Sequence, residues 1–523
     1  MIEKNMTRGV SVGALAALLA GCGHLPIAEP AFEAMSVKRA GMPADWTVAP
    51  MTGDPAAAVA DYSVFQDAQL IAFVQEALEN NRTLRAAIES VRQSEASLQQ
   101  TRSRLFPQIT GSVSAGTSAL VDDFSNTTDN YSFALRGGYD VDIMGDLSAS
   151  ITASSAGLRS TEATYEQTRR QIAAQVARAY FTVIEQQQQL ELDRRSLERQ
   201  RQTFRITQTR FDAGSIARDE LVLGESRLAQ AEDSILASEA SLRSAVRALE
   251  IALGRFPQNK LTLGGALPQP PATPPLGLPE LTVRSRPDVV AAELAMIQTF
   301  ANTRIAELGP WPQLDANLAL GLQNTAINTT SDLFSFDDLA LSIGISLAQT
   351  IFDGGAIDAR VKIANSQERQ ALERYGQTII NAYGDIVAAI DQFNTLGSRN
   401  VALQKASDAA QEVLRLGELK YQEGSESLLN LFTVRDNAEV AEANLIANNR
   451  ARLEQWIILH ASLGGNPTVS QPLPTPANTA DGAKKVRTRA TRKRPLETAA
   501  VLRSRAGKKN RHAACNRPAL PRE

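Results

Sequence analysis

The sequence predicts a mainly helical protein built from two copies of one unit, with strands of the kind that form a membrane β-barrel. Three observations carry this prediction. They are an internal repeat at a constant offset, heptad spacing of apolar residues over long stretches, and two stretches where apolar and small polar residues alternate. The repeat comes first because a missed duplication would change the whole architecture.

The repeat aligns residues 210–254 with residues 420–464 at an offset of 210 without a gap, and nine of the 45 aligned positions are identical. Gly-Ser opens both copies, Ala-Glu lies inside both, and Leu-Gly closes both. Chance similarity between two Ala- and Leu-rich helices is the alternative. The matched placement of the identities favours duplication.

The N-terminus has the pattern of an exported lipoprotein. Two basic residues precede an apolar run, and Leu19-Ala20-Gly21-Cys22 resembles the bacterial lipobox, in which the cysteine is diacylated. An ordinary signal peptide with an incidental cysteine is the alternative. Gly23 follows the cysteine, where an aspartate commonly signals retention of a lipoprotein in the inner membrane, so transport to the outer membrane is expected. We therefore expect a signal peptide at 1–21, lipid attachment at Cys22 and an N-terminal linker at 22–60.

The first structural repeat, 61–255, is predicted to begin with a helix and a strand pair. Helical periodicity covers 61–104. Alternation of apolar and polar residues over 109–116 and 131–136, on either side of a polar loop at 121–130, then predicts two strands.

A long helical hairpin completes this repeat. Apolar residues recur every seven positions from Ser148 to about Phe211, which predicts a supercoiling helix of roughly 95 Å at about 1.5 Å per residue. A turn at Gly214 leads into a second helix that returns to Gly254. The Pro-rich connector 256–282 follows, a composition that the interior of a helix or sheet excludes.

The second structural repeat, 283–465, has the same order. Arg286-Pro287-Asp288-Val289 opens a helix, and alternating residues over 314–322 and 339–347 predict the second strand pair. Phe352-Asp353-Gly354-Gly355 leads into another long helix with heptad seams. Each repeat is therefore expected to contain a helix, a strand hairpin and a long helical hairpin.

The four predicted strands have one face of Leu, Ile, Val and aromatic residues and another of Ala, Ser, Gly, Asn and Asp. Such strands fit a half-buried soluble sheet or a barrel with lipid outside and water inside. The small polar face favours the barrel, because a soluble sheet would show more Lys and Glu. Four strands are too few to close a barrel, since known barrels begin at about eight, so several chains must contribute.

The C-terminal tail differs from the rest of the chain in its charge. Residues 481–523 hold 14 Lys and Arg against three acidic residues, so the tail 466–523 is expected to be basic and disordered. For this tail, contact with anionic lipid or cell-wall polymer, or no function, is favoured over contact with nucleic acid.

The sequence has no motif typical of catalysis or metal binding. Cys22 and Cys515 are the only cysteines, and His24, His460 and His512 are not spaced as metal ligands are. We expect no enzyme activity, metal or cofactor.

Taken together, these features resemble the TolC-like outer-membrane factors, specifically the lipoprotein branch of efflux channels (the RND-type outer membrane lipoprotein family). The resemblance covers about residues 61–465 and includes the motifs at 286–289 and 352–355. It implies a homotrimer with a shared twelve-stranded barrel and a long periplasmic tunnel of helices. It also implies docking to a periplasmic adaptor (membrane fusion) protein, which joins an inner-membrane pump. Gly214-Ser215 and Gly424-Ser425 are expected to form the tips, where they either dock the adaptor or serve only as turn residues.

The residues that narrow the periplasmic mouth are expected near the same tips. In relatives, acidic residues lie six and nine positions after the second tip glycine, but Asn430 and Thr433 occupy those positions here. Asp219 and Glu220 follow the first tip instead, and a three-fold ring of them would attract cations. Ordinary solvated charges at the tip are the alternative.

The predicted function is a trimeric outer-membrane channel that exports small molecules as part of a tripartite efflux system. The predicted location is the Gram-negative outer membrane, with a lipid anchor and a long periplasmic portion. One alternative is the exit duct of a type I protein secretion system. A periplasmic adaptor and a structural or adhesive surface coiled-coil lipoprotein are two others, but neither would need duplicated strand hairpins. The sequence does not indicate the cargo.

Overall fold

The structure is a computed structural model, and the described residues all belong to one unit, Met1–Pro467. The residues that it describes are 43, 45–47, 62–120, 123–271, 277–322 and 339–463. The predicted signal peptide, Cys22 and the basic tail lie outside the described residues.

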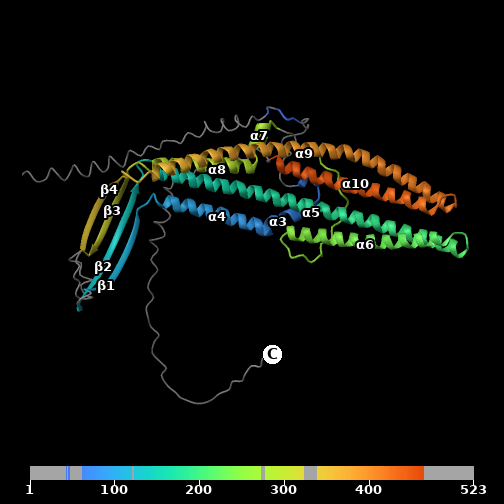
Figure 1. Cartoon of the computed structure of the whole chain (residues 1–523), viewed down its shortest axis with the longest axis horizontal. Coiled ribbons are helices and arrows are strands. Elements are labelled where there is room, and N and C mark those ends of the chain that lie inside the picture. The colour runs from blue at the N-terminus through green and yellow to red at the C-terminus, as the bar shows by residue number, and fades with distance from the viewer. Residues whose placement is uncertain are drawn as a thin grey trace, which may run out of the picture. The chain divides into compact units, whose positions relative to one another are not determined.

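Two long helical hairpins dominate this unit, as Figure 1 shows. Helices α5 (Asp146–Asp212) and α6 (Arg218–Ala252) form the first, and α9 (Ala356–Gln422) and α10 (Leu428–Ser462) form the second. Both α5 and α9 have 67 residues, both α6 and α10 have 35, and every corresponding boundary differs by 210. The predicted duplication of the hairpins is confirmed.

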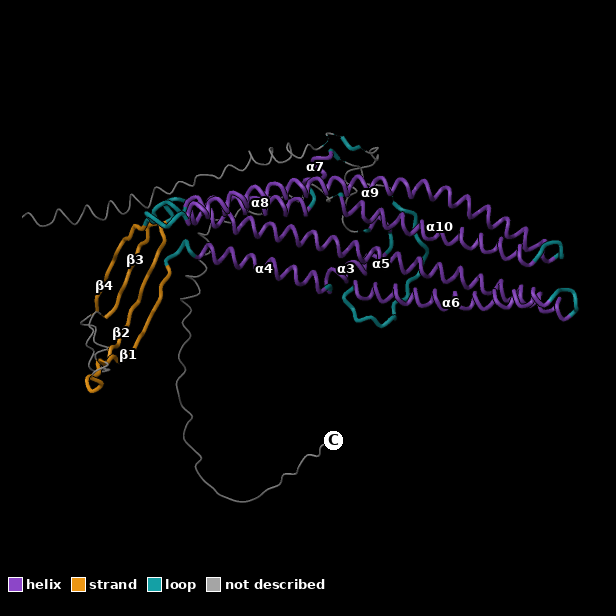
Figure 2. Tube along the Cα trace, viewed as in Figure 1, coloured by secondary structure: helices purple, strands orange, loops and turns teal. Residues whose placement is uncertain are grey.

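The hairpins lie side by side with α5 against α10, so the helices follow one another in the order α6, α5, α10, α9 (Figure 2). The turns that reverse both hairpins lie at the same end of this row. None of the helices in the part of the chain that the structure describes is both long and apolar enough to cross a membrane.

A four-stranded antiparallel sheet lies at the opposite end of the helices from these turns (Figure 1). Its strands are β1 (Gln108–Leu120), β2 (Asp123–Val141), β3 (Gln313–Leu322) and β4 (Leu339–Ala348), in that order. Strand β2 begins at Asp123, so the loop expected at 121–130 was wrong. Backbone pairing, such as that between Ala119 and Thr127, extends the ladder without any apolar alternation.

The predicted division of the sheet into two faces is confirmed. Leu318 lies opposite Ile343, and the same face continues along all four strands. These side chains are uncovered in the single chain, since Ile343 is 76% and Val113 74% exposed. The other face presents small polar residues such as Ser342 and Asn317. An uncovered apolar face on a sheet with two open edges is what a lipid-facing sheet shared among chains requires.

The helix expected over 61–104 is instead a 3₁₀ turn, η2 (Ser63–Phe65), followed by α3 (Ala68–Asn80) and α4 (Arg82–Ser103). Asn81 causes the break, because it is extended and caps α4 by accepting hydrogen bonds from the backbone N–H groups of the next turn.

The connector differs from its prediction at its C-terminal end. A six-residue helix, α7 (Pro279–Arg284), begins within the Pro-rich stretch that was expected to hold no helix and ends in the second repeat. Pro279 is its first residue, a position where the missing N–H costs nothing. Helix α8 (Pro287–Leu308) begins at Pro287 as predicted.

The strands pass into the long helices through two matching turns. Gly145 and Gly355, with φ of 85° and 91°, precede α5 and α9, and this left-handed conformation suits glycine. Asp142 accepts a hydrogen bond from Leu147 N at 3.1 Å, and Asp353 accepts one from Ile357 N at 2.6 Å. A carboxylate therefore caps the first turn of each long helix.

The main hydrophobic core joins α3, the middle of α5 and the ends of α6 and α10. Phe65 packs edge-on against Trp456 with ring centroids 5.0 Å apart, and His460 stacks on the same tryptophan at 5.0 Å. Asp67 caps α3 and accepts the Tyr180 hydroxyl hydrogen bond at 2.6 Å. These contacts hold the two hairpins together at mid-length.

Candidate functional site

Both long hairpins reverse through the same turn. Gly214 and Gly424 have φ of 74° and 78°. Ser215 N donates to Arg210 O at 2.8 Å, and Ser425 N donates to Lys420 O at 2.9 Å. These bonds, with those of the glycine N–H groups, form a Schellman motif in which glycine takes the left-handed position. The four predicted tip residues are exposed at the turns.

The helices that follow these turns begin differently. Ser427 caps α10 by accepting a hydrogen bond from Asn430 N at 3.2 Å, whereas Ala217 provides no side-chain cap for α6. Asp219 and Glu220 lie in the first turn of α6, where negative charge stabilises the helix dipole. These acids therefore have a local structural role at the start of α6, where no side chain caps the helix.

The candidate aperture residues lie on the surface close to the tips. Asp219, Asn430 and Thr433 are exposed and Glu220 is half-buried. Thr433 donates its hydroxyl hydrogen bond to Leu429 O in its own helix at 3.0 Å. Their role in narrowing a channel mouth stays a prediction.

Behind the tips, a small apolar cluster joins the two hairpins. Tyr421, Leu428 and Phe432 are buried there, and Ile206 of α5 packs against them. Arg210 of α5 adds polar contacts, because it donates to Tyr421 O at 3.0 Å and its guanidinium lies 4.7 Å from the centroid of the Tyr421 ring. The tips of the two hairpins are thus held to one another within the chain.

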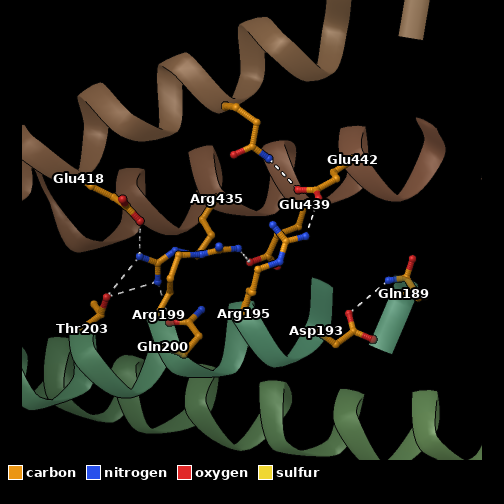
Figure 3. A network of polar contacts seen from close by, with 11 residues as sticks. Gln189, Asp193, Arg195, Arg199, Gln200, Thr203, Glu418, Arg435, Glu439 and Glu442 are labelled. Atoms are coloured by element: carbon orange, nitrogen blue, oxygen red, sulfur yellow. Dashed lines mark hydrogen bonds and ion pairs between the residues drawn. The ribbon is translucent and has the colours of Figure 1, made fainter. Parts of the chain in front are cut away.

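A polar layer crosses the contact between the two hairpins beside this cluster (Figure 3). It consists of side chains from α5, α9 and α10: Arg195, Arg199, Gln200, Thr203, Gln411, Glu418, Arg435, Glu439 and Glu442.

Two ion pairs form one part of this layer. Arg195 contacts Glu442 at 2.6 Å, and Arg199 contacts Glu439 at 3.2 Å. Each pair joins α5 of the first hairpin to α10 of the second, as Figure 3 shows. Electrostatic contacts between oppositely charged helix faces therefore replace apolar packing over this stretch.

Arg435 is the most buried member of the layer, with 2% of its surface exposed. It donates to Gln200 Oε1 at 3.1 Å, to Thr203 Oγ1 at 3.3 Å and to Glu418 Oε1 at 3.2 Å. Burial lowers the pKa of Arg435, Glu418 opposes this change, and neighbouring Arg199 adds to it. Two of its three partners lie on α5 and one lies on α9, so Arg435 connects α10 to both helices.

The sequence interpretation did not single out Arg435. Its signal was its position in a heptad stripe, because Leu428, Leu431, Arg435 and Ala438 follow the spacing of apolar seam residues. A charged residue at such a position indicates a polar contact inside a helical interface.

The contacts of Arg286 show the structural role of the motif at 286–289, which opens α8. It is 7% exposed and pairs with Asp288 at 2.7 Å and Asp385 at 3.2 Å, and it donates to the carbonyls of Ala382 and Ser462. Burial alone would lower the pKa of Arg286, but the two carboxylates outweigh it and raise the pKa. The motif therefore fastens the start of α8 to α9 and to the end of α10.

Glu250 holds the connector in a similar way. Its carboxylate, 3% exposed, accepts hydrogen bonds from Gln258 N at 2.7 Å, Asn259 N at 2.8 Å and Lys260 N at 3.0 Å. Burial raises the pKa of Glu250, but the three backbone N–H groups outweigh it and leave the pKa below its usual range.

Among the described residues, no group of three or more His, Cys, Asp or Glu is placed to hold a metal ion.

The architecture and its sequence define one family. The family model described as outer membrane efflux protein matches residues 73–255 and 278–465, which cover both repeats. The chain belongs to the outer membrane efflux protein family.

Individual relatives agree with this assignment. The chain is 25% identical over 428 residues to the pyoverdine export outer membrane protein OpmQ of Pseudomonas aeruginosa, covering 77% of this chain and 86% of OpmQ. It is 27% identical over 406 residues to the cation efflux system protein CusC of Escherichia coli, covering 77% and 87%. It is also 23% identical to the probable outer membrane lipoprotein SilC of Salmonella typhimurium, covering 77% and 87%.

Solved structures show the same fold. The crystal structure of the Campylobacter jejuni CmeC outer membrane channel matches with a TM-score of 0.73 and 19% identity, over 86% of this chain and 94% of CmeC. A crystal structure of CusC matches with a TM-score of 0.70 over 81% and 97%. The predicted family is confirmed, and the chain is an outer-membrane efflux channel of the kind used in tripartite systems. The exit duct of a type I secretion system is not favoured.

Proposed function

We propose that three copies of this chain close one barrel and one helical tunnel through which small molecules leave the cell. The single observation that carries this proposal is the four-stranded sheet with an uncovered apolar face and two open edges, β1 and β4. Unpaired edges are excluded from lipid, so the edges must pair with other copies. Three copies give twelve strands, within the range of known barrels.

Two measurements test the assembly. Native mass spectrometry of the detergent-solubilised protein should give a trimer, and planar bilayers containing it should show discrete conductance steps. A monomer that conducts, or a trimer that never conducts, would contradict the proposal. Because a conduit needs no chemistry of its own, we propose that the chain is not an enzyme and that partner proteins supply the energy for transport.

The exposed tips are the proposed contact with a periplasmic adaptor, and through it with an inner-membrane pump. This proposal is supported by the position of Gly214-Ser215 and Gly424-Ser425, which end both hairpins far from the sheet. A Cβ atom added at Gly424 would meet nothing within 4 Å, so the chain itself leaves open space next to this turn. Gly424→Lys should weaken crosslinking to the adaptor without lowering the trimer level, whereas unchanged crosslinking would leave the tip residues with a role in the turn only.

The lipid anchor is proposed at Cys22, which lies outside the described residues. The lipobox pattern and the lipoprotein name of the relative SilC support it. Cys22→Ser should abolish labelling by radioactive palmitate, whereas Cys515→Ser, the matched control, should retain it. Labelling that survives Cys22→Ser would exclude this anchor.

The two repeats are proposed to divide at the connector, with 61–255 and 283–465 on either side of 256–282. Cargo selection is proposed to lie with the pump, because the relatives are named for cargoes as different as pyoverdine and cations. Exchange of the pump, with this channel kept, should therefore change the exported compound.

A further inference from the structure

A hollow of about 400 Å³ lies between the helices near the sheet, where α4 and α8 lie on either side of α5 (Figures 1 and 2). Its volume lies within the range of about 300–1,000 Å³ that is typical of pockets for small molecules. We propose that this hollow binds small uncharged molecules bearing hydroxyl and amide groups on the inner wall of the conduit. The proposal rests on the channel proposed above.

Small residues of α5 form the floor of the hollow. Ser150, Ala153 and Ser154 follow one another at the helical spacing of three and four residues, so they lie on one face of α5. Thr101 of α4 joins this floor, since its hydroxyl lies 2.9 Å from the hydroxyl of Ser154. Short side chains on the middle helix, between longer ones on its two neighbours, leave the hollow open.

Three side-chain amides line the walls of the hollow. Gln100 comes from α4, and Gln298 and Asn302 come from α8. Among the described residues, none of these three amides takes part in a hydrogen bond. Gln298 lies against α5 at Gly157, where an added Cβ atom would be 3.1 Å from the Nε2 atom of Gln298. Each amide can both donate and accept hydrogen bonds, as the hydroxyl and amide groups of a ligand require.

The charge around the hollow favours an uncharged ligand. Among the described residues that line it, Arg104 alone is charged. Arg104 contacts two carboxylates outside the hollow, that of Asp140 at 3.5 Å and that of Asp146 at 4.0 Å. Because these carboxylates balance the guanidinium, the hollow offers no net positive charge to an anion. The lining therefore suits hydrogen bonding to a neutral molecule.

Arg104 also shows which side of the helices the hollow faces. Its partner Asp140 lies opposite Asp315, and Asp315 lies opposite Ser346, on the small polar face of the sheet. In the proposed barrel this face surrounds the water-filled interior. The hollow therefore opens toward the interior of the conduit. A site on a conduction path must release its ligand, so we expect a dissociation constant in the millimolar range.

Saturation-transfer NMR of the detergent-solubilised protein tests the site with N,N′-diacetylchitobiose, an uncharged probe that has hydroxyl and acetamido groups. Gln298→Ala with Asn302→Ala removes two hydrogen-bonding groups, so the dissociation constant should rise roughly 5- to 100-fold. Ser150→Met, which fills the hollow and leaves the amides in place, should abolish binding. Gln99→Ala is the matched control, because Gln99 is an exposed glutamine beside Gln100 that does not line the hollow.

Two results would overturn the site. One is the absence of a signal from the wild-type protein, and the other is equal affinity in the wild-type protein and in both variants of the hollow. Circular dichroism of each variant checks that a loss of binding is not a loss of folding. Citrate, a hydroxyl-bearing anion, should give no signal, and binding of citrate equal to that of the probe would overturn the choice of an uncharged ligand.

Planar bilayers test whether the hollow lies on the conduit. The probe at millimolar concentration should cause brief interruptions of the wild-type single-channel current, and Ser150→Met should remove them. Binding without interruptions would overturn the position on the inner wall and leave the proposed channel intact. Wild-type protein that never conducts would contradict the proposed channel and this position together, whereas the NMR result would still decide whether the hollow binds the probe.

Discussion

Replacement of Arg435 by methionine should loosen the packing between α5 and α10. Methionine fills a similar volume but donates no hydrogen bond, so Gln200 Oε1 and Thr203 Oγ1 would lose their donor. Gln200 is 6% and Thr203 5% exposed, and water therefore has little access to either acceptor. The expected effect is local, because the apolar cluster at the tips and the core at mid-length remain intact.

The magnitude follows from these contacts. A buried acceptor left unpaired costs about 1–3 kcal/mol, and two acceptors are affected here. The substitution also removes the cost of burying the guanidinium, whose Nε has no hydrogen-bond partner among the described residues. The net loss should be about 2–4 kcal/mol in the free energy of local opening.

Hydrogen–deuterium exchange over α5 and α10 measures this loss. Since each 1.4 kcal/mol is a factor of ten, amides in both helices near Arg435 should exchange about 30- to 1,000-fold faster. Glu418→Gln is the matched control. The Glu418 side chain is 33% exposed, so water can replace its contact and the expected change is below about 1 kcal/mol.

A compensated variant sharpens the test. Arg435→Met with Gln200→Leu and Thr203→Val removes the unpaired acceptors together with the charge. Well-packed apolar residues of similar volume can replace a buried ionic group without loss of stability, so protection should recover. Unchanged exchange in Arg435→Met would refute the view that this arginine fixes the α5/α10 contact.

Three further predictions concern other parts of the chain. The pKa of Glu250 lies below the ordinary value of about 4.3, so the stability that the ionised carboxylate contributes is present above that pH and is lost as pH falls through the lower value. Limited proteolysis of the connector should therefore increase as the pH falls through the lower value. In Glu250→Gln the connector should be cleaved rapidly at every pH. Ile343→Arg would place a charge on the lipid-facing side of β4, which should cost about 2–4 kcal/mol near the membrane midplane and block insertion of the protein. The Ser342→Arg protein, with the charge on the opposite face, should still insert. Heat-modified gel mobility measures the inserted fraction of both. Asp219→Ala with Glu220→Ala should lower cation selectivity in single-channel recordings; unaltered selectivity would leave these acids with their structural role at the start of α6.

The long helices and the strands were predictable because their patterns repeat over many residues. Heptad spacing over 148–211 located α5 to within two residues at its start, and alternation over 314–322 and 339–347 located β3 and β4. The break at Asn81 was missed because one capping side chain decides it within an otherwise helical composition. A single hydrogen-bonding residue leaves almost no trace in a periodicity.

The candidate site was only partly predictable for a different reason. The tip turns need glycine, so Gly214 and Gly424 could be recognised from the sequence. The polar layer could not be recognised in this way, because it depends on which faces of two distant hairpins meet. Arg199 and Glu439 are 240 residues apart along the chain, and no local pattern relates them.

The two hairpins use the acidic residues at corresponding positions, Glu232 and Glu442, in different ways. In the first hairpin Arg201 contacts Glu232 at 3.8 Å, and in the second the corresponding Gln411 donates to Glu442 at 2.9 Å. The neutral amide occupies only one carboxylate oxygen of Glu442, and the other accepts from Arg195 of the neighbouring hairpin.

Chain connectivity explains why the contact between α5 and α10 can be polar. Two hairpins in one chain are held at a high effective concentration, so their interface can consist of polar contacts that fix register but add little net stability. Two separate copies must also overcome the lost freedom of association, which polar contacts alone offset poorly. Apolar Val413 on α9 at the position of Thr203, and exposed Val222 and Leu236 on α6, fit that requirement. These differences between the repeats are therefore those expected if, as proposed, the chain assembles with further copies of itself.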